Sequence, residues 1–196
     1  MTAVYFILVL LATFLAMEGI TWLTHRFVMH GFLWYLHRDH HQKEPGFFEK
    51  NDWFFVIFAI PSMLLILFGT TRSVWWMQAI GFGIMAYGAA YFIVHDVIIH
   101  QRFKWFSRSK STYVRAIRWA HKMHHKHLGK EHGESFGMLY VHRRYWEKIR
   151  RDKQLMAGKH YGFEPDDIGP GLLDRVRSDW RELRPLVDWI ATHAMT

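Results

Sequence analysis

The sequence predicts an all-α integral membrane protein, a helical bundle with about three to four transmembrane helices. Of its 196 residues, 51% are hydrophobic and none is cysteine. Three apolar segments, roughly 3–23, 53–69 and 75–94, occupy most of its first half. Because a helix of about 20 apolar residues crosses the hydrocarbon core of a bilayer, each segment has the length and composition of one span.

The first apolar segment carries a single charged residue, Glu18. It lacks the basic start of a secretory signal peptide and continues directly into His25, so we expect it to be retained as a membrane helix. Glu18 lies seven residues before His25, on the same helical face. A carboxylate inside a membrane is a functional candidate. It either orients a nearby imidazole or pairs with a buried arginine, and the sequence leaves both readings open.

The second and third apolar segments are separated by the short turn 70–74. In the third, Gly81-x-Gly83-x-x-Ala86 echoes a dinucleotide-binding fingerprint, but the motif lies in an apolar helical pattern with no strand before it. We therefore expect Gly81, Gly83 and Gly88 to allow close packing of helices.

Lysine and arginine predict the orientation of these spans. Four lie in 24–52, one in 70–74 and twenty in 96–196. Cytoplasmic loops of membrane proteins carry the excess of these residues. The sequence therefore predicts an outside N-terminus, a cytoplasmic C-terminus and a cytoplasmic helical cap.

The positive charge is concentrated in one part of the chain. The net charge is +8, and residues 102–153 hold fifteen lysines and arginines against four acids. Because apolar spans adjoin this segment, we expect it to face anionic lipid headgroups and an acidic protein partner, and we expect no nucleic acid partner.

Ten histidines form four ordered blocks, HxxxxH, HxxHH, HxxxxH and HxxHH. They are His25, His30, His37, His40, His41, His95, His100, His121, His124 and His125. The stretch WLTHRFVMHGF at 22–32 is similar to FIVHDVIIHQRF at 92–103, and an HxxHH block follows each. Each half of the chain thus offers five imidazoles.

The spacing of the blocks has geometric content. In an α-helix, the three histidines of HxxHH lie within about 100° of arc and share one face. The two histidines of HxxxxH are about 140° apart on a regular helix, so they straddle two metals, sit at a helix end or use a π-turn. We expect the helix end, with the two histidines on separate metals.

The number of histidines predicts two metal ions. A structural zinc needs four ligands, whereas ten imidazoles suit two ions of higher coordination number. Nitrogen ligation favours Fe, Zn, Cu or Ni. Asp39 and Asp96 lie inside the second and third blocks and are candidates, with Glu18, for holding a ligand N–H. His127 and His132 are better explained as loop residues.

The same blocks resemble those of the fatty acid hydroxylase and sterol desaturase superfamily of membrane di-iron enzymes. Within it, the chain is similar to the bacterial β-carotene 3-hydroxylase family through THRFVMHG, HRDHH, FIVHDVIIHQRF, HKMHHKH and GESFGMLYV, over about residues 15–155. The resemblance implies O2-dependent hydroxylation of the β-ionone ring at C3, from β-carotene through β-cryptoxanthin to zeaxanthin, with canthaxanthin to astaxanthin as a further reaction.

The resemblance also implies cofactors, partners and a location. Ten histidines would hold two irons, which zinc can replace, and electrons would come from a ferredoxin and its reductase. The protein would lie in a bacterial inner membrane with its metal site on the cytoplasmic side. Alternatives are a fatty acyl or sterol hydroxylase or desaturase, a carotenoid ketolase, and a non-enzymatic membrane protein that binds or transports metal.

The expected domains are a membrane hydroxylase domain over 1–155 and a tail over 156–196 with an amphipathic helix at 172–192. The exposed tail histidines His160 and His193, like His142, are expected to be solvated. The sequence does not choose substrate-binding residues among Trp34, Phe92, Phe103 and Phe136.

Overall fold

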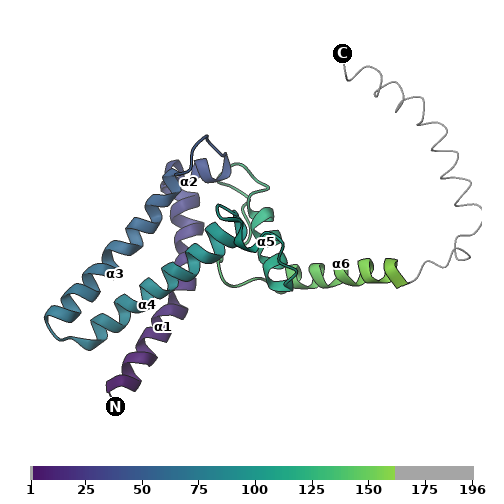
Figure 1. Ribbon diagram of the computed structural model, residues 1–196. Coiled ribbons are helices and arrows are strands. Elements are labelled where there is room, and N and C mark those ends of the chain that lie inside the picture. The colour runs from purple at the N-terminus through teal and green to yellow at the C-terminus, as the bar shows by residue number, and fades with distance from the viewer. Residues whose placement is uncertain (1, 162–196) are drawn as a thin grey trace, which may run out of the picture. The chain divides into compact units, whose positions relative to one another are not determined.

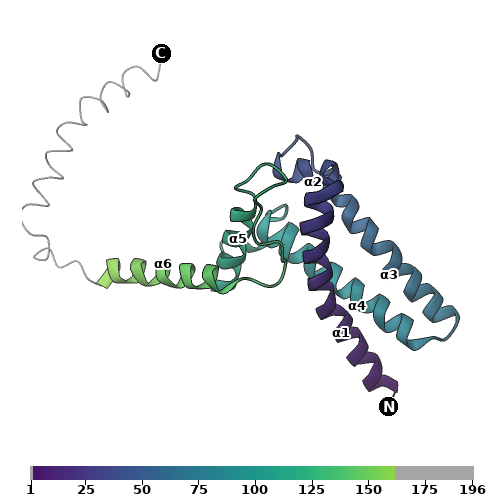
Figure 2. The same ribbon diagram turned by 180° about the vertical axis from the view of Figure 1, so that it is seen from behind.

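The computed structural model describes residues 2–161, and every regular element in that range is a helix. The long helices are α1 (Thr2–Leu23), α3 (Trp53–Thr71) and α4 (Trp75–Phe92). The shorter α2 (Trp34–His41) and α5 (Thr112–His124) lie at the opposite end of these helices from the α3–α4 turn (Figures 1 and 2). Helix α6 (Arg143–Tyr161) follows α5.

The three predicted spans are confirmed as helices. Continuous helical stretches long and apolar enough to cross a membrane cover Ala3–Phe32, Lys50–Thr71 and Trp75–Ile99, and these are the three found among the described residues. Their outward side chains are exposed apolar groups, such as Leu15 at 72% and Met63 at 67%. Such a surface is stable in lipid, where the backbone hydrogen bonds are satisfied within each helix.

Helix α4 packs against both α1 and α3, and glycine makes both contacts close. A Cβ at Gly81 would lie 2.7 Å from Ile66 of α3, and one at Gly83 would lie 2.7 Å from Thr13 of α1. Positions i and i+2 of a helix point in nearly opposite directions, about 200° apart. The predicted packing role is therefore confirmed for these two glycines, whereas Gly88 has no heavy atom within 4 Å of such a Cβ.

The spans continue beyond α1 and α4 as π-helices, η1 (Thr24–Phe32) and η3 (Ile93–Ile99). An apolar core then joins η3 to α5 and to the start of α6, through residues such as Ile98, Ile117 and Ile149. The Arg118 side chain donates to the carbonyl oxygens of Ile98 at 2.7 Å and Phe106 at 2.9 Å. Helix α5, which carries the last histidine block, is thus fixed against the end of the third span.

The chain divides into two compact units, residues 1–150 and 151–196, within α6. The histidine blocks all belong to the first unit. The predicted helix at 172–192, His160's side chain and His193 lie outside the described residues, and the boundary at 155/156 stays a prediction.

Candidate metal centre

The two HxxxxH blocks lie in π-helical turns at the ends of the first and third spans, so the π-turn and the helix end that the sequence offered as alternatives occur together. In η1 the backbone N–H of Leu33 donates to Val28 O at 3.0 Å, and after η3 the N–H of His100 donates to His95 O at 2.9 Å. A hydrogen bond from residue i+5 to residue i defines a π-turn. The wider turn brings positions i and i+5 above one another, so both histidines of each pair point to the same side.

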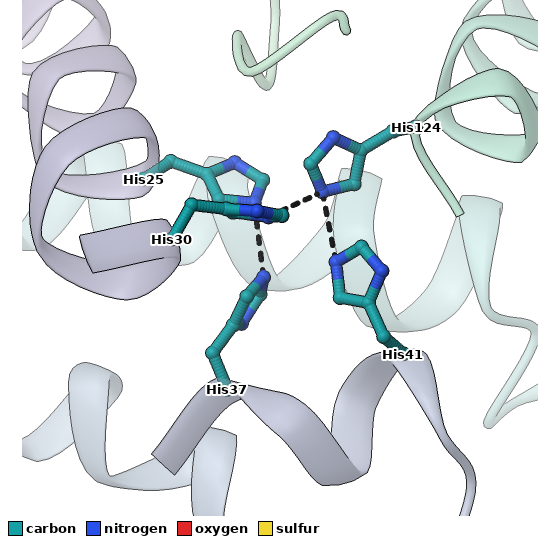
Figure 3. A group of neighbouring side chains, drawn as sticks. All are labelled: His25, His30, His37, His41 and His124. Carbon is teal, nitrogen blue, oxygen red and sulfur yellow. Dashed lines mark hydrogen bonds between the residues drawn. The ribbon is translucent and has the colours of Figure 1, made fainter. Parts of the chain in front are cut away.

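Five buried histidines converge in what we call the first histidine group. Its ligand nitrogens lie within 4.8 Å of one another, and its members are His25, His30, His37, His41 and His124. Figure 3 shows these rings directed at one another from η1, α2 and α5. The Nε2–Nε2 distances are 3.1 Å for His25–His37 and His41–His124, and 3.2 Å for His30–His124.

The second histidine group consists of His40, His95, His100 and His121, again with nitrogens within 4.8 Å of one another. His125 adjoins it, because its Nε2 lies 2.8 Å from Nε2 of His121. Both members of each HxxxxH pair therefore fall in one group, which corrects the expectation that they would serve separate metals. The ten predicted histidines are thus brought together as two adjacent sets.

The outer nitrogen of every ring in the first group faces a neutral oxygen. The Nδ1–H groups of His25, His30, His41 and His124 donate to the backbone oxygens of Phe136, Lys130, His127 and Glu134, and that of His37 donates to Asn51 Oδ1, at 2.7–3.1 Å. Because these oxygens only accept, each ring carries its proton on Nδ1 and a lone pair on Nε2.

This protonation pattern tests whether the site suits a metal. Five Nε2 lone pairs face a common centre within 4.8 Å of one another, and the closest pairs are 3.1 Å apart. Unprotonated nitrogens cannot hydrogen-bond to one another, so their mutual repulsion is removed only by a cation between them. Neutral imidazoles whose second N–H is held by an oxygen are the usual form of metal-binding histidine. The donor set fits Fe, Zn, Cu or Ni.

In the second group, by contrast, two histidines have carboxylates as the partners of their outer nitrogens. The Nδ1–H of His40 donates to Glu49 at 2.8 Å and that of His95 faces Asp96 at 3.3 Å. Arg102 joins these two acids, with contacts of 3.3 Å to Glu49 and 3.1 Å to Asp96, and it also pairs with Asp52 at 2.9 Å.

Of the three acids proposed to hold a ligand N–H, only Asp96 faces an imidazole. Asp39 accepts the backbone N–H of Lys50 instead. Glu18 accepts hydrogen bonds from the Tyr87 hydroxyl and from three backbone N–H groups. Among the described residues it pairs with no arginine and contacts no imidazole directly, so it can orient an imidazole only through the segment that it holds.

Burial keeps the histidines outside the spans neutral. Removal from water, with a smaller contribution from neighbouring imidazoles, lowers the pKa of His41 to about 4 and that of His125 to about 3. Burial likewise lowers the pKa of the other histidines outside the spans, which are His37, His40, His100, His121 and His124. Neutral rings are the form that binds a metal without first losing a proton.

Several outer residues were not found from the sequence. Asn51, Glu49 and Arg102 belong to no histidine block, and the backbone oxygens that hold the first group have no sequence signature. A polar segment just before an apolar span was the one available signal for Glu49 and Asn51. His127 contributes its backbone oxygen rather than its ring, and His132 and His142 are exposed.

A cavity of about 550 Å³ lies among α1, α3, α4 and the segment before α3. Its wall is mainly apolar, and of the ten histidines His95 alone lines it. Two of the four aromatic candidates, Phe92 and Phe103, also line it. The other two pack on the first group instead, Trp34 at 5.2 Å from the His30 ring and Phe136 at 5.4 Å from the His25 ring.

Comparison with known proteins identifies the family. The sequence profile of the fatty acid hydroxylase family matches residues 10–147, a range that includes all four histidine blocks. The chain belongs to the fatty acid hydroxylase family.

The relatives of this member of the fatty acid hydroxylase family include enzymes named for carotenoids. A β-carotene hydroxylase of Pantoea ananas is 43% identical over 68% of this chain and 76% of its own length. One of Paracoccus sp. (strain PC1) is 38% identical over 68% and 83%. A chloroplastic β-carotene 3-hydroxylase of Haematococcus lacustris is 37% identical over 54% and 33%. No solved structure gave a significant match.

Proposed function

We propose that this protein is an O2-dependent carotenoid hydroxylase that converts β-carotene through β-cryptoxanthin to zeaxanthin. In each step one oxygen atom of O2 enters the C3–H bond of a β-ionone ring. Two electrons and two protons reduce the other atom to water. The observation that carries the proposal is the convergence of ten histidines into two groups, in a chain 36–43% identical to bacterial β-carotene hydroxylases.

The ten histidines are proposed to hold two iron ions, one in each group, with zinc able to take their place. Bound iron would supply the activation of O2 that no side chain can provide for a saturated C–H bond. The residues of the chain have other tasks. Asn51, Glu49, Asp96 and the loop carbonyls fix the tautomer and direction of the imidazoles, and burial excludes water from them.

We further propose that the cavity beside His95 receives one end ring of the carotenoid. The cavity lies among spans whose outer faces are apolar, so a lipid-soluble polyene can enter from the membrane. Its volume of about 550 Å³ is within the usual range for small-molecule sites. Tyr91 stacks on His95 at 4.9 Å and fixes that ring at the end of the cavity.

Electrons are proposed to come from a ferredoxin-type protein and its reductase. The chain has no cysteine for an iron–sulfur relay, and the fingerprint around Gly81 and Gly83 packs helices. The basic segment 102–153, which also carries His121 and His125, presents exposed lysines and arginines, including Lys104, Arg108 and Lys126. Positive charge of this kind attracts an acidic donor.

The protein is proposed to lie in a bacterial inner membrane, as its bacterial relatives suggest, and the lysine and arginine distribution supports a cytoplasmic side for both histidine groups. The basic segment is contiguous with the histidine-bearing ends of the spans, while the turn between α3 and α4 contains one arginine, Arg72. This asymmetry follows the positive-inside pattern.

Expression in cells that accumulate β-carotene, followed by pigment analysis, tests the proposal. We expect β-cryptoxanthin and zeaxanthin from the wild type, and astaxanthin in cells that supply canthaxanthin. His121→Ala should leave β-carotene unchanged, whereas the matched control His142→Ala, at an exposed position, should keep the wild-type pattern. Keto products would indicate a ketolase, and unchanged carotenoid with altered acyl chains or sterols would contradict the assigned substrate.

A further inference from the structure

Glu18 is a membrane carboxylate that holds a distant loop. Its oxygens accept hydrogen bonds from the Tyr87 hydroxyl at 2.7 Å and from the backbone N–H groups of Met138, Leu139 and Tyr140 at 2.9–3.1 Å. These four donors come from α4 and from a segment about 120 residues later in the chain. A charge in an apolar span is stabilised when its hydrogen-bonding capacity is filled in this way.

The loop that Glu18 holds is the one that orients the first histidine group. We call residues 126–142 the carbonyl loop, because four of its backbone oxygens accept the Nδ1–H groups of His25, His30, His41 and His124. The last of these oxygens belongs to Phe136, two residues before the first N–H bound by Glu18. Glu18 therefore fixes the loop immediately beside its contacts with the imidazoles.

The carbonyl loop cannot hold its conformation by itself. It contains no helix or strand, and His132 and Ser135 adopt the left-handed backbone region with φ of 62° and 63°. Such residues persist where surrounding contacts hold them. The three backbone hydrogen bonds to Glu18 supply a restraint of this kind.

The second histidine group does not depend on the loop in this way. Its two described Nδ1 partners are the carboxylates of Glu49 and Asp96, which lie before α3 and within η3. Arg102 joins those carboxylates without a contact to Glu18 among the described interactions. The two groups thus have separate outer supports.

We propose that Glu18 is a positioning residue for the first histidine group alone: by holding the carbonyl loop, it keeps the imidazoles of one metal position in their binding orientation. This inference rests on the proposal that each group holds one metal. It predicts that loss of the Glu18 carboxylate weakens one metal position and leaves the other intact.

Metal analysis of the purified full-length chain tests this proposal independently of hydroxylation. Wild type, Glu18→Gln and Glu18→Ala are loaded with Zn²⁺ or Fe²⁺ in detergent, and bound metal is counted during exposure to a chelator. The wild type should keep two ions. Glu18→Ala should release one ion about 10–100-fold faster, as expected for loss of an outer support, and Glu18→Gln should do so to a smaller degree.

Double variants identify which ion is lost. Glu18→Ala combined with His124→Ala should lose no more metal than His124→Ala alone, because both act on the first group. Glu18→Ala combined with His100→Ala should lose both ions. Glu147→Gln, at an exposed glutamate that pairs with Arg143, is the matched control and should retain two ions at the wild-type rate.

Outcomes that overturn the inference are distinct from failure of the proposed function. Wild-type metal retention in Glu18→Ala, equal loss of both ions, or binding of fewer than two ions by the wild type would each contradict it. Two ions with no carotenoid product would contradict the function and leave the inference standing. If Glu18→Ala does not fold, Tyr87→Phe, which removes one hydrogen bond to Glu18, should still accelerate release of one ion, and its failure to do so would overturn the inference.

Discussion

The Nε2 atoms of His40 and His95 lie 3.1 Å apart although 55 residues separate them in the chain. His40 therefore leaves its neighbours His37 and His41, which belong to the first group. Around a helix axis, His41 is rotated by about 40° from His37 in one direction, whereas His40 is rotated by about 60° in the opposite direction. One HxxHH block thus serves two centres at once.

The second HxxHH block repeats this division in reverse. His124 joins the first group, while His121 and its neighbour His125 lie with the second. Each half of the chain thus supplies four histidines to one set and one to the other. This exchange joins the two halves of the chain through the histidines themselves.

His37 and His40 of one HxxHH block should affect different metal positions. His37→Ala and His40→Ala should each lower product formation by at least about 100-fold, since outer partners alone account for 10–100-fold effects. His37→Ala with His124→Ala should retain one ion per chain, and His37→Ala with His40→Ala should retain none. Metal analysis of the purified variants distinguishes these results, and an equal count in the two double variants would show that the grouping is wrong.

The charge on the group that accepts from an imidazole N–H should change the reduction potential of one metal position and not of the other. Glu49→Gln replaces the carboxylate that accepts from His40 with a neutral amide. The imidazole then becomes a weaker donor, so the ferric state loses stability and the reduction potential rises, by about 60 mV per 1.4 kcal/mol for a one-electron couple. Asn51→Asp, behind His37, should shift the other position downward. Redox titration of the iron-loaded variants would detect both shifts in reduction potential. Shifts of the same sign would contradict the assignment of Glu49 and Asn51 to different metal positions.

Glycine should be required where α4 meets its neighbours. A Cβ at Gly81 would lie 2.9 Å from the Ser62 backbone oxygen, and one at Gly83 would lie 2.8 Å from that of Leu10. Gly81→Ala and Gly83→Ala should each lower the free energy of unfolding by about 1–3 kcal/mol, the usual cost of overpacking. Thermal unfolding in detergent measures this, with Gly19→Ala as the control because no atom lies within 4 Å of its Cβ position. Because alanine favours a helix more than glycine does, the control should lose no stability, and an equal loss there would contradict the close-packing explanation.

A large side chain at Gly88 should block the cavity without disturbing the two histidine groups. Gly88 lines the cavity and has free space at its Cβ position. Gly88→Phe should abolish or strongly reduce zeaxanthin formation while two ions remain bound, because the added ring occupies the volume proposed for the end ring of the substrate. Pigment and metal analysis of the same preparation checks both parts. Full activity in this variant would place the substrate elsewhere.

Reversal of charge on the basic segment should weaken the encounter with an acidic donor. Lys104→Glu, Arg108→Glu and Lys126→Glu remove exposed positive charge, which chiefly accelerates association. The combined variant should raise the donor concentration required for half-maximal turnover and reduce the dependence on salt, with unchanged metal content. Steady-state kinetics with purified ferredoxin and reductase measures this, and an unchanged donor requirement would exclude this surface.

The sequence alone determined the spans, the ten histidines and the packing role of Gly81 and Gly83. Hydropathy is a sum over contiguous residues, and a membrane accepts an apolar segment as a helix because its backbone must satisfy its own hydrogen bonds. These features depend on composition and local spacing, so they could be predicted before any helix was placed beside another.

Tertiary structure decided how those residues are divided. The π-turns at His25–His30 and His95–His100, the exchange of His40 and His124, and the role of Glu18 in holding the carbonyl loop all depend on how the helices are rotated and which segments meet. A backbone oxygen can accept from an imidazole whatever side chain it bears, so the supports of the first group have no sequence signal. Sequence thus specified the ten histidines, and the packing of the helices specified which histidine group each one joins.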